Sequence, residues 1–339
     1  MSDAPTDTPD PVPDFARNAV NLASAGLGAR AIAVSDDFFA EVGRMLEDKP
    51  PLWLADKYDD NGKWMDGWES RRKRGPGHDH AIVKLAVPGV IRGFDVDTSY
   101  FTGNYPPACS VEGCNVKGDP GAGTAWTPIL PLTKLGASAH HYFRAQSEST
   151  WTHVRLNIYP DGGVARFRVY GEPWLDHGAL AGKSIDLASA LNGGRVIAYS
   201  DAHYGAFRRM LAPGRGTDMG DGWETRRRRV PGNDWIIVAL GARGIIESAE
   251  IDTAHYKGNF PDSASMQAAD LGHAFDALDE AVVAASMFWN ELLPPQKLKA
   301  DAIHAFETVN AIGPVTHVRV NIFPDGGISR LRLHGTLAE

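Results

Sequence analysis

The 339-residue sequence contains little cysteine: only Cys109 and Cys114, which both lie in the short segment CSVEGC. Two thiols cannot form the disulfide framework that stabilises a small secreted domain. We therefore expect free thiols and a reducing, cytosolic compartment. A zinc site would need two further ligands, which the sequence does not identify.

Long hydrophobic runs and an excess of basic residues are also missing. No apolar run approaches the roughly 20 residues that cross a bilayer, and the N-terminal residues MSDAPTDTPDPVPDF are acidic and proline-rich, unlike a secretory signal. We expect residues 1–18 to form a disordered tail.

The net charge is −8, with 34 Lys and Arg against 42 Asp and Glu, which argues against a protein that coats phosphate backbones. We therefore expect neither nucleic acid nor membrane as a partner.

The usual signatures of covalent or zinc-dependent hydrolysis are absent too. The sequence has no GxSxG nucleophile motif, no HExxH zinc helix and no glycine-rich phosphate loop. Chemistry through a covalent intermediate is therefore disfavoured.

What the sequence does contain is a long internal repeat. DGWESRRKRGPGHDHAIVKL from Asp66 recurs as DGWETRRRRVPGNDWIIVAL from Asp221, and THVRLNIYPDGGVARFRVYG from Thr152 recurs as THVRVNIFPDGGISRLRLHG from Thr316. Further blocks recur in the same order, including Ser35-Asp36 as Ser200-Asp201. This order predicts two homologous domains, at residues 19–172 and 183–336, joined by a linker at 173–182.

The pattern inside each copy predicts strands. Val154, Leu156 and Ile158 alternate with polar residues, and the PDGG segment predicts a hairpin turn into a second alternating strand, in which Ala165, Phe167 and Val169 would face inward. Residues 81–98 predict two further strands around a glycine turn. Helix is expected only at 36–46, at 275–290 and around position 141. The fold class is all-β, with one antiparallel β-sandwich per repeat.

The arginine runs provide the first candidate site. A Trp-Glu pair precedes the arginines in both copies, and this mixture of groups suits a small planar anion, because guanidinium binds carboxylate bidentately and indole offers a flat apolar wall. The alternative is a polar strand whose arginines pair with nearby acidic residues. The candidate binding residues are Trp223, Arg226 and Arg227, with Glu69, Arg71 and Arg72 in the first copy.

Histidines provide the second candidate site. His255 and Asn259 lie in DTAHYKGNFP, where Asp252 is close enough in sequence to bond His255 and raise its pKa, as a general acid requires. The first repeat has Tyr100 at the position of His255, so the two copies differ chemically. A solvated loop histidine is the alternative. His317 begins the polar face of the second hairpin, and substrate binding and a solvated surface are equally good interpretations of it.

At these motifs the sequence resembles the allantoicase family. DGWETRRRR, DTAHYKGNFP, DVDTSYFTGNYP and the paired THVR-x-NI-x-PDGG blocks carry the resemblance, from about Asn21 to Gly335. It implies two tandem jelly-roll sandwiches similar to galactose-binding domains. It also implies a cytosolic enzyme of purine degradation that hydrolyses allantoate to ureidoglycolate and urea.

Roles for the residues follow from that chemistry. The arginines would hold the substrate carboxylate, His255 would protonate the departing urea, and Glu224 or Asp252 would activate water. No cofactor is expected, although a divalent metal held by His and Asp is an alternative Lewis acid. A homo-oligomer is expected. The rival interpretation is a tandem carbohydrate-binding module without catalytic activity.

Overall fold

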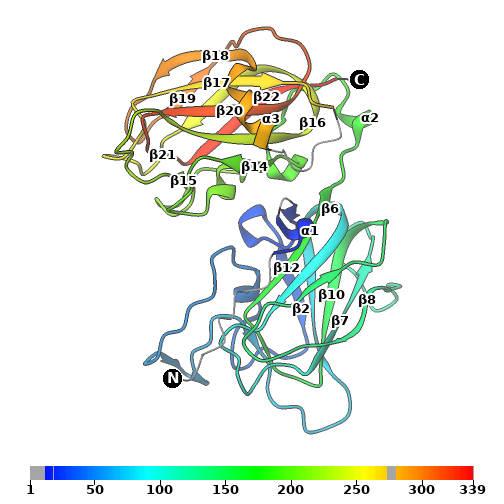
Figure 1. Cartoon of the computed structure of the whole chain (residues 1–339). Helices are drawn as coiled ribbons and strands as arrows, with labels where there is room; N and C mark the ends of the chain where they lie inside the picture. Colours follow the sequence, from blue (N-terminus) through cyan, green and yellow to red (C-terminus); the bar gives the residue numbers. More distant parts are fainter. Residues whose placement is uncertain (1–11, 18, 273–279, 339) are drawn as a thin grey trace.

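A computed structural model describes residues 12–17, 19–272 and 280–338. Figure 1 shows two β-rich bodies, one for each repeat. Of the predicted N-terminal tail, Asp14–Arg17 form a helical turn, α1, while residues 1–11 and 18 lie outside the described part. None of the described helices has the length and apolar character needed to cross a membrane.

The first repeat contains one eight-stranded sheet and two small pairs of strands. The large sheet consists of β1 (Val20–Asn21), β2 (Arg30–Val34), β6 (Asp79–Asp97), β7 (Ala108–Cys114), β8 (Thr127–Lys134), β9 (Tyr142–Arg144), β10 (Thr150–Tyr159) and β12 (Arg166–Pro173). The small pairs are β3 (Tyr58–Asp59) with β4 (Gly62–Lys63), and β5 (Trp68–Glu69) with β11 (Gly163–Val164). Two short 3-10 helices, η1 (Ala25–Leu27) and η2 (Val42–Leu46), complete it.

The second repeat reproduces this sheet strand for strand. After the short helix α2 (His177–Leu180) come β13 (Ile185–Asp186), β14 (Arg195–Tyr199), β16 (Asp234–Asp252), β17 (Ser263–Ala269), β18 (Asn290–Lys297), β19 (Ile303–Phe306), β20 (Val315–Phe323) and β22 (Arg330–Leu337). The small pair is β15 (Trp223–Glu224) with β21 (Gly327–Ile328). The helical elements are η3 (Ala190–Asn192), η4 (Phe207–Leu211), α3 (Glu280–Ala285) and η5 (Ser286–Phe288).

One long strand in each repeat joins the two layers of the sandwich. The first half of β6 pairs with β2 and β10, and its second half pairs with β12 and β9. The register shifts between the two halves, which allows the strand to bend from one layer into the other. The prediction of two strands around a glycine turn at residues 81–98 was therefore wrong, because a single bulged strand spans them.

The alternation of apolar residues is confirmed, but the predicted hairpin is not. Val154, Leu156 and Ile158 are fully buried, as are Ala165, Phe167 and Val169. However, β10 pairs with β6 and β7, whereas β12 pairs with β6 and β1. The PDGG segment thus crosses from one layer of the sandwich to the other, and the two apolar sets face each other across the core.

Two of the three predicted helices were wrong. Within residues 36–46 only η2 is helical, because the Asp36 carboxylate accepts hydrogen bonds from the backbone of Phe38 and Arg71 and so holds its segment as a loop. Around His141 the chain is a loop that leads into β9: Nε2 of the ring accepts a bond from Gly136 N, and Nδ1 donates to Val96 O. Within residues 275–290, α3 and η5 are helical, and 273–279 lie outside the described residues.

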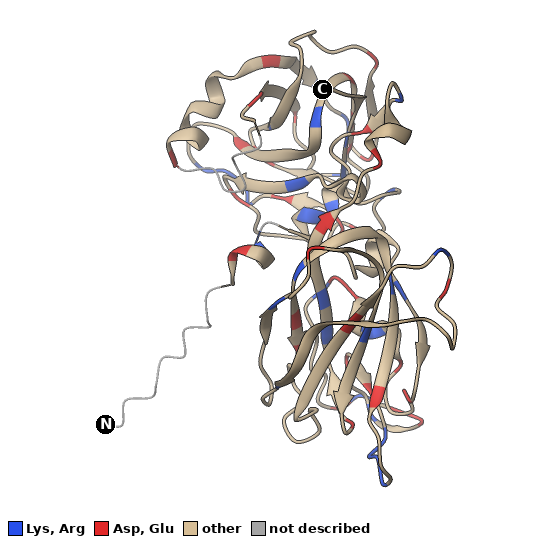
Figure 2. Ribbon diagram, turned by 90° about the vertical axis from the view of Figure 1, so that its right-hand side faces the viewer, with Lys and Arg blue, Asp and Glu red and all other residues tan. Residues whose placement is uncertain are grey.

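Polar contacts join the two repeats. Arg209 of the second repeat pairs with Asp48 of the first at 2.8 Å, and Arg208 donates to the carbonyl of Arg17 at 2.6 Å. Lys49 lies 3.6 Å from Asp218. Figure 2 shows basic and acidic residues interspersed through both repeats, so the arginine runs are local features of a mixed surface.

Candidate functional site

Three repeated motifs meet at one end of each sandwich. In the second repeat, Thr225 N donates to Gly326 O of the PDGG segment, and Gly327 N donates to Asn259 O of the GNFP loop. A side chain at Gly326 would collide with the backbone of Phe260 and Pro261, and its φ of 138° also favours glycine. The first repeat makes the matching bonds through Ser70, Gly162, Gly163 and Asn104. We call this junction of three motifs the candidate site of each repeat.

A glutamate and an asparagine are bonded to each other at the centre of each candidate site. Asn259 Nδ2 donates to Glu224 Oε1, and in the first repeat Asn104 Nδ2 donates to Glu69 Oε1 at 2.7 Å. Burial raises the pKa of Glu69, although the bond from Asn104 opposes the rise. In the second repeat the structure therefore brings together Glu224 and Asn259, two candidate residues that lie in separate motifs of the sequence.

The first arginine of each run is paired with an aspartate. Arg226 donates from its backbone and its guanidinium to Asp201, at 2.7 and 2.9 Å, and Arg71 does the same with Asp36, at 2.8 and 2.7 Å. Burial raises the pKa of Asp201, but the bonds from Arg226 lower it by more. These two aspartates were missed as site residues, although the recurrence of Ser-Asp in both repeats was the signal that could have found them.

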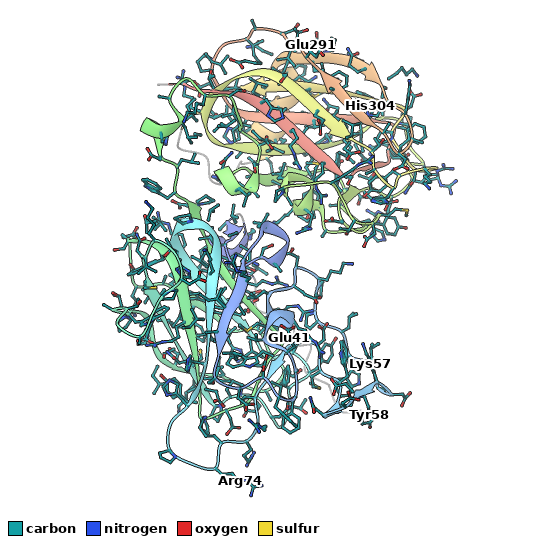
Figure 3. The ribbon with its side chains drawn as sticks, turned by 180° about the vertical axis from the view of Figure 1, so that it is seen from behind. Glu41, Lys57, Tyr58, Arg74, Glu291 and His304 are labelled. Carbon is teal, nitrogen blue, oxygen red and sulfur yellow. The ribbon has the colours of Figure 1, made fainter. Side chains whose placement is uncertain are left out.

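The second arginine of each run is exposed. Arg227 and Arg72 make no hydrogen bond or ion pair within the described part of the chain. The run is a strand only at its start, because regular strand ends at Glu224 and the chain then continues as a loop. Figure 3 shows Arg74, at the end of the first run, at the tip of a loop on the end of the first repeat that faces away from the second.

The tryptophan of each motif belongs to the core. Trp223 is fully buried and donates from Nε1 to the carbonyl of Asp201 at 2.8 Å, and Trp68 donates in the same way to Asp36 O. A fully buried indole presents no face to a ligand, so Trp223 does not provide the flat apolar wall expected from the sequence. Instead it anchors the loop that carries the arginine's aspartate partner.

His255 is held in a strained backbone conformation. Its φ of 71° lies in the left-handed region, as does the φ of 68° at Tyr100, its counterpart. The backbone N–H of His255 donates to Asp301, and its Nε2 donates to the carbonyl of Gly216 at 2.8 Å. Because a carbonyl can only accept, this bond places the proton of the neutral ring on Nε2 and leaves Nδ1 as the proton acceptor.

Asp252 does not bond to His255, which corrects the expected Asp-His pair. Its carboxylate accepts from Arg215 at 2.9 and 3.3 Å and from the backbone of Ala254 at 2.8 Å. The side chain is almost fully buried. Arg215 was missed because the sequence of its loop, APGRGTDMG, does not recur in the longer corresponding loop of the first repeat. There, His140 contacts Asp95 at 2.9 Å and approaches Asp97, the counterpart of Asp252, at 3.8 Å.

A buried ion pair holds the end of the loop that carries Arg215. Arg330 is 2% exposed and bonds to Asp221 at 2.7 Å, and Arg209 bonds to the other carboxylate oxygen at 2.7 Å. Burial raises the pKa of Asp221, but the bonds from Arg209 and Arg330 outweigh it and lower the pKa to about 2. The first repeat has the matching pair of Arg166 and Asp66 at 2.9 Å.

His317 is buried on β20. Its Nδ1 is 2.9 Å from Thr316 Oγ1, and its ring packs against Trp289. On the same face of the first repeat, His153 and Asn157 are also buried, whereas Arg155 between them is partly exposed. Within the described residues, no three His, Cys, Asp or Glu side chains are grouped as metal ligands would be.

The fold and the doubled site define a protein of two tandem β-sandwiches, each with the same junction of three motifs. Comparison with known proteins agrees with this class. The family model described as "Allantoicase repeat" matches residues 20–174 and 185–338. The chain belongs to the allantoicase family.

Relatives of known name and structure match nearly the whole chain. A protein from Rhizobium meliloti named "Probable allantoicase" is 57% identical over 330 residues, covering 97% of each chain. Another, from Pseudomonas aeruginosa, is 54% identical and covers 94% of this chain and 96% of its own. The crystal structure of allantoicase from Saccharomyces cerevisiae superposes with a TM-score of 0.79 at 34% identity, covering 94% of this chain and 93% of that one.

Proposed function

We propose that this protein hydrolyses allantoate to ureidoglycolate and urea. The observation that carries the proposal is the junction of three motifs, which places a glutamate–asparagine pair and an arginine run together in a chain of the allantoicase family. The substrate has a carboxylate on a carbon that bears two ureido groups. Hydrolysis breaks the bond from that carbon to one nitrogen and forms a bond from the carbon to a water oxygen.

The exposed arginine is the better candidate for binding the carboxylate. Arg226 is already engaged by Asp201, whereas the guanidinium of Arg227 has no partner among the described residues. Arg226 with Asp201 then fixes the direction of the loop, and Arg227 takes the carboxylate in a bidentate bond. Arg71 and Arg72 have the same division of roles in the first repeat.

His255 and Glu224 take the acid and base roles in this proposal. The bond from Nε2 to Gly216 O leaves Nδ1 of His255 to carry the proton that neutral urea needs as it departs. Glu224 accepts the proton that the attacking water loses, since Asn259 occupies one of its oxygens and orients the other. Asp252 is the weaker candidate for the base, because Arg215 and Ala254 already use its oxygens. His317 is assigned no part in the reaction.

Urea release from allantoate tests the function. The purified chain should release urea and ureidoglycolate in equal amounts, and the rate should be the same after dialysis against EDTA. Loss of activity on dialysis, restored by a divalent ion, would overturn the metal-free mechanism while keeping the function. If no urea is released from allantoate, the tandem carbohydrate-binding module becomes the better interpretation.

Location and assembly are part of the same proposal. The two cysteines, both free and buried, suit a reducing cytoplasm, and we propose a symmetric homo-oligomer. Light scattering of the purified chain measures the assembly, and a mass equal to one chain at micromolar concentration would contradict it.

A further inference from the structure

A groove on the outer face of the first repeat is not part of the candidate site. It is a cavity of about 500 Å³ over β6, β10, β7 and β8, on the face of that layer opposite the core. Its floor is polar, with His80, Glu112 and Arg155 at the centre, and its rim on β8 is apolar, with Leu130 and Leu132. None of these residues takes part in the backbone bonds that define the candidate site.

The polar floor is held in place by its own hydrogen bonds. Arg155 bonds to Glu112 at 2.6 Å and stacks over Trp126 at 4.7 Å, and Asn157 donates to the same Glu112 oxygen at 2.9 Å. The hydroxyls of Ser110 and Tyr159 lie 3.0 Å apart. A floor that is already ordered costs little entropy when a ligand binds.

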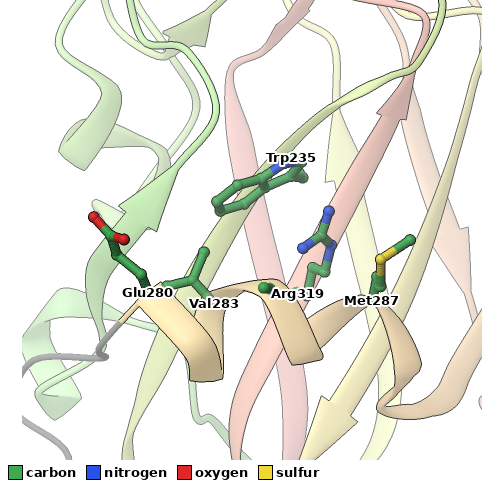
Figure 4. A pocket seen from close by; sticks show the side chains of 6 residues that line it. Trp235, Glu280, Val283, Met287 and Arg319 are labelled. Carbon is green, nitrogen blue, oxygen red and sulfur yellow. The ribbon is translucent and has the colours of Figure 1, made fainter.

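The second repeat covers the matching face. Trp289 follows Ala269 by 20 residues, whereas Trp126 follows Cys114 by only 12. The longer segment includes α3 and η5, which lie over part of this face and leave a smaller cavity of about 340 Å³, in which Figure 4 shows Val283 and Met287 beside Trp235 and Arg319. Ser286 of η5 accepts a bond from Arg319 at 2.6 Å.

The residues of the groove also differ from those of the covered face. His80, Glu112 and Tyr159 of the first repeat are replaced by Trp235, Gln267 and Phe323 at the matching register positions of the second. Among the described residues, the first repeat therefore has the larger groove and the fuller set of hydrogen-bonding groups.

The charges inside the groove cancel. Arg155 and Glu112 neutralise each other, and burial, together with the positive charge of Arg155, lowers the pKa of His80 and so favours its neutral ring. Nearby Asp79 is itself paired with Lys73 at 2.8 Å. A groove without net charge gives a charged ligand no advantage over a neutral one.

We propose that this groove of the first repeat binds a small uncharged molecule with one apolar face and a hydrogen-bonding edge. The apolar face would lie against Pro131 and Leu132, and the edge would bond to His80, Glu112 and Tyr159. Uncharged ureides and monosaccharides share this chemistry. The site is separate from the candidate site, so its occupation does not depend on the proposed reaction.

Ligand-observed NMR of the full chain tests this proposal with hydantoin as the ureide, D-galactose as the sugar and acetate as the charged comparison. One of the two neutral probes should bind with a dissociation constant on the order of 1 mM, a magnitude reasonable for ligands of this size, and acetate should not. Binding of hydantoin alone would show that the groove takes ureides, and binding of galactose alone would show that it takes monosaccharides.

Variants locate the binding. His80→Trp introduces the residue that the second repeat carries at this position, so the fold accommodates it, and the indole should fill the groove and weaken binding at least tenfold. Tyr159→Phe, which copies Phe323, should weaken it by a smaller factor. His177→Trp adds an indole on the exposed helix α2 and should change nothing.

Three results would overturn the proposal: no binding of either neutral probe at 20-fold above the expected constant, equal binding by His80→Trp and the unaltered chain, or preferential binding of acetate. Turnover of allantoate is measured in the same His80→Trp sample and should be unchanged. If turnover falls while the circular dichroism spectrum is retained, the groove is part of the active site and the proposal of a separate site is overturned.

Discussion

At the scale of single residues, the two repeats share their supporting contacts and differ in the groups that could react. Glu69 and Glu224 are each bonded to an asparagine at matching positions of the two repeats. Likewise, Arg71 and Arg226 are each bonded to a matching aspartate. The left-handed position, in contrast, carries a tyrosine in one copy and a histidine in the other. Duplication has preserved the geometry of the site and changed one side chain that it displays.

The role of His255 is tested by replacing it with asparagine. Asparagine tolerates the left-handed backbone better than alanine does, so His255→Asn removes the titratable ring with little added strain. Turnover should fall on the order of a hundredfold to ten-thousandfold, the usual range for a general acid. The matched control is Tyr100→Asn, which makes the same change at the same φ in the first repeat and should cost much less. Nearly full turnover in His255→Asn would assign the proton donor elsewhere.

The role of Arg227 is tested by exchange for lysine, which keeps the charge and loses the planar fork. Steady-state kinetics of Arg227→Lys should show a KM raised by roughly tenfold to a hundredfold, equivalent to about 1.5–3 kcal/mol of charge-assisted bonding. Arg229→Lys makes the same exchange two residues further along and should leave KM unchanged. An equal effect of both substitutions would point to general electrostatic attraction and against a specific bond.

At the scale of structural elements, the loop before β15 explains why the second repeat can support His255. Gly216 of this loop accepts the bond from the histidine ring, Arg215 bonds to Asp252, and Asp221 ends the loop on the buried Arg330. The corresponding loop of the first repeat instead carries Trp53, which stacks on Tyr100 with ring centres 6.1 Å apart. The loop therefore determines the surroundings of the residue in the left-handed position.

The buried Asp221–Arg330 pair predicts acid sensitivity. The pKa of Asp221 is about 2 in the folded state, against about 3.9 for an ordinary aspartate. Its charged form therefore stabilises the fold above pH 4, by about 2.6 kcal/mol, and this contribution is lost as the pH falls from 4 towards 2. Asp221→Asn should be destabilised at pH 7 by about 3–5 kcal/mol, because it leaves Arg330 buried without a counter-charge.

Chemical denaturation of both proteins between pH 7 and pH 2.5 measures this effect. The difference in unfolding free energy between the unaltered chain and Asp221→Asn should shrink as the pH falls below 4. A difference that stays constant over the whole range would show that the Asp221 carboxylate does not titrate differently in the folded and unfolded states.

At the scale of the whole molecule, one arginine connects the two repeats to the candidate site. Arg209 bonds to Asp48 of the first repeat and to Asp221 of the second, so the loop that supports His255 is also part of the contact between repeats. Buried apolar residues of both repeats belong to one hydrophobic cluster, and the second site is completed next to the first repeat. We therefore expect the repeats to behave as a coupled pair.

A double-mutant cycle measures this coupling. Asp48→Asn and Arg209→Gln, alone and combined, should show an interaction free energy of about 1 kcal/mol or more, because both side chains are about four-fifths buried. The control cycle is Asp262→Asn with Lys297→Gln, an exposed ion pair inside the second repeat, for which less than about 0.5 kcal/mol is expected. Equal values in the two cycles would argue against a specific contact between the repeats.

The sequence by itself determined the duplication, the strand-rich class and the inward set of residues such as Val154 and Phe167, because burial imposes a period of two on every strand of a sandwich. It also identified Glu224 and Asn259, which the structure bonds together. Only the tertiary structure decided which strands pair, and it separated the predicted hairpin into two layers. It also placed Trp223 in the core and bonded Asp252 to Arg215. The physical reason is that burial leaves a local pattern in the sequence, whereas strand partners and ion pairs depend on residues far apart in the chain, whose approach no local pattern records.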